Sequence, residues 1–298
     1  MHRLTLYAQL MRIDRPVGTL LLLWPTLAAV VLAGRGEIDW RLISIFTIGT
    51  FVMRSAGCVV NDILDRNVDP YVQRTRNRPL ARRAIGVGEA ILLAAALLAI
   101  ALLLAVQLKP VTLGWALAGG LIAIAYPLAK RVTYLPQVVL GVAFSWGILL
   151  AFVELHDAVP DTGWIMFIGS LLWIVAYDTF YALVDRKDDL QIGVRSTAVL
   201  FGEGAVAIIA LLQICTLVVW YLVGYTAEFG LPYHVALIAI AGLFLHQQTM
   251  VRINPSLKGD HDTRQRRAYL RAFRSNTWVG FALLLGILGE YLLPGLQA

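Results

Sequence analysis

The sequence contains few charged residues and few cysteines, and each shortage narrows the class of protein. Only 15% of its 298 residues are charged, whereas a soluble domain carries about 25%. The two cysteines, Cys58 and Cys215, lie in apolar segments, so neither a disulfide framework nor a thiolate metal centre is expected. The five histidines lack ligand spacings such as H-x-x-x-H, which argues against a zinc or haem site.

Apolar residues are abundant instead, at 59% of the chain against a usual value of about 45–50%. This balance excludes an ordinary soluble enzyme, a disordered chain and a nucleic-acid-binding module, and it leaves a polytopic membrane protein. A helix needs about 20 apolar residues to cross a bilayer, and the alternating segments of a β-barrel are missing. We therefore predict an all-α, single-domain membrane protein (1–298) with nine spans, at about 17–33, 41–60, 90–108, 111–128, 135–153, 163–180, 204–223, 232–248 and 277–293.

Basic residues are concentrated on one side of the predicted bundle. That side receives the N-terminal segment and residues 61–89, 129–134, 184–202 and 249–276, and with Arg54 near the end of the second span it holds 22 of the 25 Lys and Arg. The positive-inside rule then places the N-terminus and these segments in the cytoplasm and the C-terminus outside. The first apolar run is interpreted as a retained helix because no cleavage site is convincing. The lack of a Ser- and Arg-rich leader favours a bacterial inner membrane over a mitochondrion.

Acidic residues are few, and seven of the 19 fall in two short stretches on the predicted cytoplasmic side. In the first stretch, Asp62, Asp65 and Asp69 lie within about 60° of one another if the second span continues as a helix. Pro70 disfavours helical geometry in the residue before it, so Asp69 is the predicted last helical residue. The three carboxylates are thus expected on one face of a helix end.

The second acidic stretch has the same character. Its members share an arc of about 100° on a helix, and they are Asp178, Tyr181, Asp185, Asp188 and Asp189. Carboxylates stacked at a membrane edge repel each other and are costly when partly buried, and a cation offsets both penalties. One D-x-x-x-D pattern fits a solvated helix end equally well. Two of them, at 65–69 and 185–189, favour a Mg²⁺ site with room for phosphate oxygens and an internal repeat of about four helices.

At these residues the chain resembles the UbiA superfamily of intramembrane prenyltransferases. The first motif of that family, N-D-x-x-D-x-x-x-D, matches Asn61, Asp62, Asp65 and Asp69, and the second, a D-x-x-x-D preceded by Tyr, matches residues 181–189. MRIDRPVGTLLLLWPT, RTRNRPL and YDTFYALVDRKDDLQIGVRST resemble the 4-hydroxybenzoate polyprenyltransferase branch in particular. YPLAKR (126–131) resembles a further segment that puts a Lys near the diphosphate.

The resemblance implies nine helices around a central cavity, with a cytoplasmic cap that carries both motifs. It implies Mg²⁺ as the cofactor, held by Asp62, Asp65, Asp69, Asp185 and Asp189. The implied reaction transfers a polyprenyl group from polyprenyl diphosphate to the carbon ortho to the hydroxyl of 4-hydroxybenzoate, giving 3-polyprenyl-4-hydroxybenzoate in ubiquinone biosynthesis. The implied partners are these two substrates and the lipid bilayer. No nucleic acid is expected, and the sequence does not indicate a protein partner.

Basic and polar residues near the motifs are candidates for binding the diphosphate, whose charge grows as it leaves. They are Asn61, Arg54, Arg74, Arg78, Lys130 and Arg131. Arg54 is the sharpest candidate, because an ionisable group within a span is functional by default, although a snorkelling Arg is the alternative. Anchoring at the membrane surface is an equal alternative for Lys130 and Arg131. The basic cluster at 264–274 is interpreted as topological or lipid-facing charge.

The acceptor side is assigned from fewer signals. Arg12 and Arg15 are candidates for the acceptor carboxylate, with a basic juxtamembrane segment as the alternative, and Tyr181 is a further acceptor-site candidate. Asp178 either orients or deprotonates the phenol or hydrogen-bonds a neighbour. The predicted catalytic residues are Asp62, Asp65, Asp178 and Asp185.

Two other functions stay open from the sequence. A secondary transporter also has many spans, an internal repeat and intramembrane acids, but its acids usually lie at the bilayer midplane. A prenyltransferase for another aromatic acceptor, such as a naphthoate or homogentisate, would carry the same metal motifs. The choice of 4-hydroxybenzoate depends on the resemblance of residues 11–26 and 178–197.

Overall fold

The computed structural model describes residues 3–252 and 261–293, and helices make up most of these two ranges. The long helices are α2 (Val17–Ala33), α3 (Trp40–Asp65), α4 (Val87–Ala105), α5 (Pro110–Val132), α6 (Pro136–His156), α7 (Asp161–Ile192), α9 (Ala205–Thr226), α10 (Leu231–Val251) and α11 (His261–Leu292). The short ones are α1 (Arg3–Leu10), η1 (Asp69–Tyr71), α8 (Thr197–Phe201) and η2 (Gly202–Gly204). Each predicted apolar run overlaps one long helix, so the predicted all-α class is confirmed.

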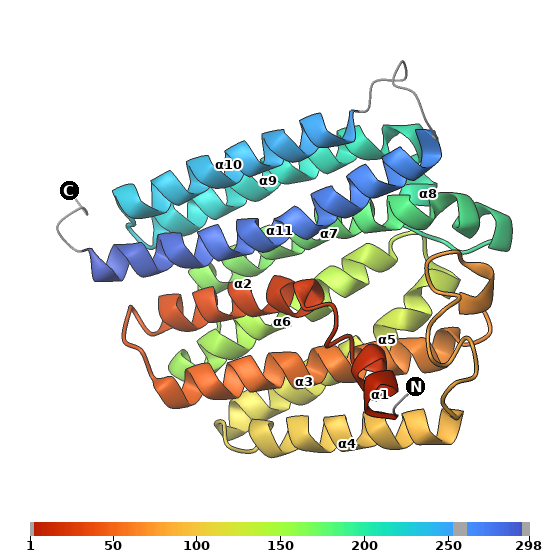
Figure 1. Ribbon diagram of the computed structural model, residues 1–298. Coiled ribbons are helices and arrows are strands. Elements are labelled where there is room, and N and C mark those ends of the chain that lie inside the picture. The colour runs from red at the N-terminus through yellow and green to blue at the C-terminus, as the bar shows by residue number, and fades with distance from the viewer. Residues whose placement is uncertain (1–2, 253–260, 294–298) are drawn as a thin grey trace.

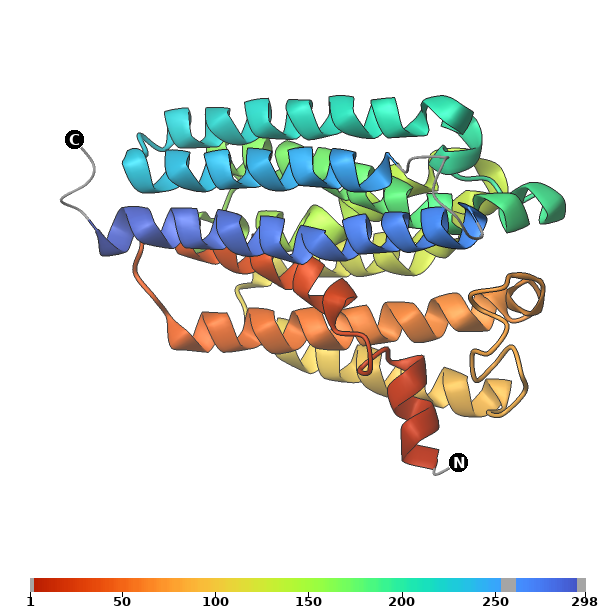
Figure 2. The ribbon, with the colours of Figure 1, turned by 45° about the horizontal axis from the view of Figure 1, so that its top comes forward.

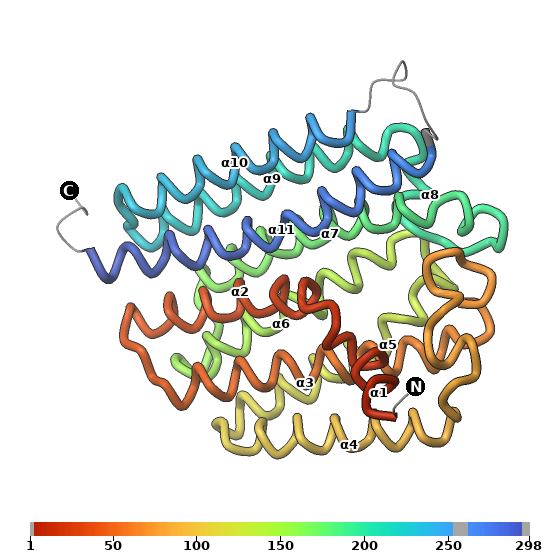
Figure 3. Tube along the Cα trace, in the orientation of Figure 1, coloured from red at the N-terminus to blue at the C-terminus, as the bar shows by residue number. Residues whose placement is uncertain are grey.

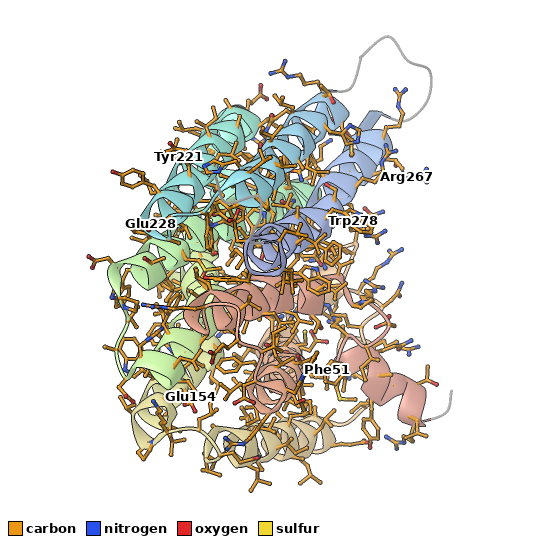
Figure 4. All side chains as sticks on the ribbon, turned by 90° about the vertical axis from the view of Figure 1, so that its left-hand side faces the viewer. Phe51, Glu154, Tyr221, Glu228, Arg267 and Trp278 are labelled. Carbon is orange, nitrogen blue, oxygen red and sulfur yellow. The ribbon has the colours of Figure 1, made fainter. Side chains whose placement is uncertain are left out.

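Seven helical stretches of the described chain are long and apolar enough to cross a membrane. They are α3, α4, α5, α6, α7, α10 and Thr197–Thr226, which contains α9. α2 is also apolar but has only 17 residues. The lateral surface is apolar as well: Tyr221 and Trp278 are exposed and project outward from the bundle (Figure 4). Such a surface suits hydrocarbon, because helices satisfy their own backbone hydrogen bonds there.

The long helices lie side by side with roughly aligned axes, whereas α1 is oriented across them (Figures 1 and 2). α3 packs on α4, α5 on α6 and α10 on α11, while α2 lies between α6 and α11. The main core fills the space between α2, α6, α7 and α11, with Trp173 and Ile148 fully buried within it. This part of the bundle is densely packed, in contrast to the region enclosed by α2 to α6.

Successive helices reverse direction, so the connecting segments collect at two ends of the bundle. The segments after α3, α5 and α7 lie at one end, which we call the motif end (Figure 3). The segments after α2, α4, α6 and α9 lie at the opposite end, the far end. The basic segments 61–89, 129–134 and 184–202, predicted to share one side of the membrane, therefore lie at the motif end. The part of the basic 249–276 segment from 253 to 260, and the last five residues, lie outside the described ranges.

The first motif departs from its predicted geometry, since Asp69 is not the last residue of the helix. α3 ends at Asp65, and Asp69 begins the separate 3₁₀ helix η1. Pro70 lies in the first turn of η1, where its missing N–H costs no hydrogen bond. Ending α3 early lets the chain fold back, so that Arg78 contacts both Asp62 and Asp69. A continuous helix would have carried Asp69 away from this shared partner.

The second motif follows the predicted geometry more closely. α7 continues without a break to Ile192, so Asp178, Asp185 and Asp189 all lie on one helix. Gly193 ends it with φ +72°, a left-handed conformation that glycine adopts without strain. The helix is longer than the apolar run at 163–180, because its last three turns extend past the apolar run with the acidic residues.

Candidate active site

The two motifs meet through the loop that follows η1. The side chains of Asp62, Asp65, Asp69, Asp185 and Asp189 are all buried at the motif end. The backbone N–H of Gln73 donates to Asp188 (3.3 Å), and Arg74 in the same loop donates to Asp185. A segment that begins at the first motif therefore closes onto the second.

Two arginines pair with the carboxylates of the first motif. Arg12 holds Asp62 through one guanidinium nitrogen, at 2.8 and 2.9 Å from its two oxygens. Arg78 lies 3.0 Å from Asp62 and 2.9 Å from Asp69. Burial raises the pKa of Asp69; Arg78 lowers it, but burial and the charge of neighbouring carboxylates outweigh Arg78. This carboxyl is thus poorly compensated and would gain from a nearby divalent cation.

Lys130 and Arg131 approach the end of α3 from the end of α5. The Lys130 ammonium pairs with one oxygen of Asp65. The other oxygen, Oδ1, is buried and has no hydrogen-bond partner. Arg131 donates instead to the carbonyl of Leu64 (2.9 Å). The structure therefore brings Lys130 to the motif carboxylates, while Arg131 contacts the adjacent backbone.

Arg74 connects the first loop to the second motif. Its Nε lies 2.9 Å and one terminal nitrogen 2.5 Å from Oδ2 of Asp185. The other terminal nitrogen donates to the Tyr181 hydroxyl (2.6 Å), and the guanidinium lies 4.5 Å from the centre of the Tyr181 ring. Burial lowers the pKa of Arg74, but Tyr181 and Asp185 outweigh it and raise the pKa above its ordinary value. Arg74 is therefore a permanent cation, and Tyr181 orients it.

The donor set fits a hard divalent cation. Within the described ranges, no three carboxylate, imidazole or thiolate groups lie close enough together to form a ready-made metal site. The reason is visible in the ion pairs, because Lys130, Arg74 and Arg78 lie among the carboxylates. The orphaned Oδ1 of Asp65 nevertheless requires a partner, and carboxylate oxygens are the ligands that Mg²⁺ prefers.

An apolar cavity of about 600 Å³ begins below the carboxylates and is walled by α2 to α6. Arg54, on the α3 wall, lines this cavity rather than the carboxylate cluster. Its guanidinium donates to Cys58 Sγ (2.5 Å) and lies 5.7 Å from the centre of the Phe144 ring. Its Nε is buried without a partner, and it forms no ion pair with a described carboxylate. Arg54 is thus a cation whose anion must come from elsewhere.

Two further groups surround Arg54. The Tyr177 hydroxyl is buried without a hydrogen-bond partner. Asp178 is half-buried and lies within electrostatic reach of Arg54 without forming an ion pair. Arg54 at the head of the cavity therefore has a phenol and a carboxylate of α7 near it, and neither forms a hydrogen bond or an ion pair with its guanidinium.

Several residues lie elsewhere than the sequence suggested. The Arg15 side chain is 67% exposed and pairs with its neighbour Asp14 (3.5 Å), so the structure does not bring it to the site. Arg12 lies at the site but contacts Asp62, because Arg3 and Tyr7 hold α1 against Glu89 of α4. Asn61 is half-buried on α3 beside the motif carboxylates.

Arg266 is not among the predicted site residues, because the basic cluster at 264–274 is interpreted from the sequence as topological or lipid-facing charge. Its guanidinium donates to the Gln73 side chain (2.9 Å) and lies 3.4 Å from Asp188. It thereby ties the start of α11 to both the first loop and the second motif. No local pattern could have revealed this contact, because the partners are 193 and 78 residues away.

This fold and site define a class, the intramembrane prenyltransferases. Residues 22–277 match the model of the UbiA prenyltransferase family, so the chain belongs to that family. The 4-hydroxybenzoate octaprenyltransferase of Tolumonas auensis is 47% identical over 282 residues, covering 95% of each chain. That of Nitrosococcus oceani is 46% identical over 291 residues, covering 98% of this chain and 99% of the relative.

Solved structures agree on the fold. The apo structure of a UbiA homologue from Aeropyrum pernix K1 matches with a TM-score of 0.78 at 23% identity, covering 91% of this chain and 97% of the other. A UbiA homologue from Archaeoglobus fulgidus bound to GPP and Mg²⁺ matches with a TM-score of 0.66 at 22% identity, covering 94% and 99%. The helical arrangement is thus that of the family.

Proposed function

We propose that this protein transfers a polyprenyl group from polyprenyl diphosphate to 4-hydroxybenzoate, at the carbon ortho to the hydroxyl. The observation that carries the proposal is the placement of two aspartate motifs with their cations directly above an apolar cavity. Curated relatives of nearly the same length bear the name of this activity. The product, 3-polyprenyl-4-hydroxybenzoate, is a ubiquinone precursor.

The motif end is suited to the diphosphate head. Asp62, Asp65, Asp69, Asp185 and Asp189 would hold Mg²⁺, which when bound offsets the negative charge of the departing diphosphate. Arg74, Arg78 and Lys130 already lie beside these carboxylates and can turn to phosphate oxygens, which guanidinium groups bind in a bidentate manner. A homologue solved with GPP and Mg²⁺ supports this assignment of the cofactor.

The cavity is suited to the prenyl tail and the acceptor. Asp62 lies eight residues beyond Arg54 on α3, so Arg54 is about 12 Å deeper along the helix. The sequence suggested Arg54 for the diphosphate, but this depth and its lack of an ion pair favour the carboxylate of the acceptor. Asp178 then faces the phenol from α7. Tyr181 serves by orienting Arg74 rather than by touching the acceptor.

The chemical step follows from this placement. The carbon–oxygen bond of the donor breaks, and the diphosphate leaves with both electrons. The ring carbon ortho to the phenol attacks the allylic cation, and loss of the proton on that carbon restores the aromatic ring. Asp178 stabilises the positive charge that the phenol develops during attack. The cavity excludes water that would otherwise capture the cation.

The same proposal covers the membrane arrangement. Nine helices, including α2 and α11, span a bacterial inner membrane, and the motif end forms a cap on the cytoplasmic face. A transporter is less well supported, because the acids lie at one end of the bundle instead of its middle.

The test offers purified protein a polyprenyl diphosphate with Mg²⁺ and a panel of acceptors, and identifies products by mass. We expect prenylated 4-hydroxybenzoate, no product after chelation of the metal, and at least a 100-fold lower kcat/KM for the neutral 4-hydroxybenzamide. In Arg54→Met, the ratio of kcat/KM for 4-hydroxybenzoate to kcat/KM for 4-hydroxybenzamide should fall to about tenfold or less. Prenylation of a naphthoate or homogentisate but not 4-hydroxybenzoate would overturn the acceptor, and no diphosphate release from any donor would overturn the enzyme.

A further inference from the structure

Glycines line the cavity at positions where a side chain would enter open space. Gly49 and Gly57 on α3 and Gly120 on α5 all lie on the cavity wall, and a Cβ added to any of them meets no atom within 4 Å. Neighbouring small residues differ in this respect. A Cβ on Gly119 would lie 2.2 Å from the Trp146 ring, so that glycine serves packing.

The α3 wall is one continuous face of the helix. Its cavity-lining residues recur every three or four positions, as helical periodicity requires, and they are Ile45, Phe46, Gly49, Thr50, Met53, Arg54 and Gly57. The face leads from Gly57 and Arg54 to Ile45 near the far end. Because α3 is unbroken, residue number along it measures depth below the carboxylates.

We propose that Gly57, Gly49 and Gly120 determine which prenyl chain lengths the enzyme accepts, by leaving the path of the tail open at successive depths. The inference rests on the proposed function and deepens it. At 1.5 Å per residue, Gly57 lies about 8 Å below Asp62 and Gly49 about 20 Å below it. An isoprene unit contributes four bonds of about 1.5 Å, or at most about 5 Å of length. Gly57 is therefore level with the first or second unit, and Gly49 with the third or fourth.

Leucine at each position gives a different expected result. A branched side chain fills the path locally, and a tail that reaches that depth must be distorted or excluded. Gly57→Leu should lower kcat/KM for geranyl, geranylgeranyl and octaprenyl diphosphates alike. Gly49→Leu should leave the geranyl donor within about twofold of wild type and slow the two longer donors at least about tenfold. Gly120, on the facing wall, lies ten residues before Lys130, or about 15 Å below the level at which Lys130 pairs with Asp65, which is between the levels of Gly57 and Gly49. Gly120→Leu should therefore slow the two longer donors and affect the geranyl donor less than Gly57→Leu does.

The matched control is Gly114→Leu. Gly114 lies on α5 like Gly120 and also has open space around it, but it is exposed and does not line the cavity. It should change the kcat/KM of all donors equally or not at all. The ratio of long-donor to short-donor kcat/KM within one variant is unaffected by partial loss of folded protein, so misfolding does not imitate the effect.

Two outcomes would overturn the inference. If Gly49→Leu affects no donor, the tail leaves sideways between α4 and α5, where the cavity-lining Leu102 and Leu121 are exposed. If Gly49→Leu slows all donors equally, the substitution disturbs the fold and does not select chain length. Stabilisation against heat by non-hydrolysable prenyl thiodiphosphates of the same lengths provides a second measurement without turnover. The dependence of this stabilisation on chain length should differ among the variants in the same order as kcat/KM does. Because no acceptor is present, this result holds even if wild type prenylates another acceptor, and the proposed acceptor can fail without affecting it.

Discussion

At the scale of single residues, the site is an arrangement of opposite charges in a buried place. The cations beside the motif carboxylates form ion pairs with them, as Arg74 does with Asp185 and Lys130 with Asp65. Arg54 is different, because its guanidinium faces an apolar cavity without a carboxylate. The paired cations can exchange a motif carboxylate for a phosphate oxygen, whereas Arg54 is free to bind an anionic group of a substrate.

The carboxylates should be indispensable individually. Asp65→Asn or Asp185→Asn keeps the shape but removes the charge of a metal ligand, so kcat/KM should fall by about 1000-fold. The measurement is product formation per milligram of protein that has inserted into the membrane. Asp157→Asn is the control, because Asp157 lies at the far end, is 69% exposed and pairs with Lys109, and it should stay within about twofold of wild type. Near-normal turnover in either motif variant would remove that residue from the metal site.

At the scale of elements, buried glutamates join helix pairs at the far end. Glu154 of α6 accepts from the backbone N–H of Lys109 (3.0 Å) and the Thr112 hydroxyl (2.7 Å) at the start of α5. Glu290 of α11 accepts in the same way from Gly230 (2.9 Å) and Tyr233 (2.8 Å) at the start of α10. In a four-helix repeat, α5 and α6 correspond to α10 and α11. In both pairs a buried glutamate of the second helix thus accepts hydrogen bonds from the start of the first. This shared contact agrees with the internal repeat that the motif spacing predicts.

Removing one of these caps should cost stability but not chemistry. Figure 4 looks at the bundle from the far end and labels Glu154, which lies near the end of α6 and accepts from the start of α5. Glu154→Ala leaves two donors without partners, at about 1–3 kcal/mol each. The midpoint of thermal unfolding in detergent should fall by about 5–10 °C, with kcat unchanged below that temperature. Glu37→Ala, at an exposed residue of the same end, should leave the midpoint in place. Equal midpoints for the two variants would contradict a capping role.

At the scale of the whole molecule, charge and packing divide the bundle in two ways. Basic segments collect at the motif end, and the positive-inside rule predicts an orientation in the membrane from them. Packing is dense around α2, α6, α7 and α11 but leaves the cavity among α2 to α6. The chain therefore has one half that is mostly core and another that encloses the cavity, beneath a charged end shared by both.

The orientation can be read with single cysteines. We expect Glu37→Cys, at the far end, to react with a membrane-impermeant maleimide added to intact bacterial cells. Arg76→Cys, in the exposed loop of the motif end, should react only after the cells are permeabilised. The parent protein measures the background labelling from its own cysteines, of which Cys58 is buried and Cys215 is partly exposed. The reverse pattern would place the motif end outside.

Some features of the site required the tertiary structure because their partners are distant along the chain. Periodicity and hydrophobicity predict α3 and α7 and place Asp62, Asp65, Asp185 and Asp189 on helices. They do not predict that α3 ends at Asp65, because that depends on Arg78 returning to contact Asp62 and Asp69. Nor do they predict that Arg12 reaches the site while Arg15, three residues later, does not. Arg12 contacts Asp62 and Arg15 contacts Asp14, and this difference depends on how α1 packs.

The sequence alone determined the membrane class, the helices, the charged end and the two motifs, because these depend on hydrophobic length, charge placement and local spacing. Only the tertiary structure decided which cation meets which carboxylate, that Arg54 faces a cavity, and which glycines leave that cavity open. The physical reason is that packing and ion pairing join residues through space. A cavity in particular is a property of several helices at once, and no single stretch of the chain encodes it.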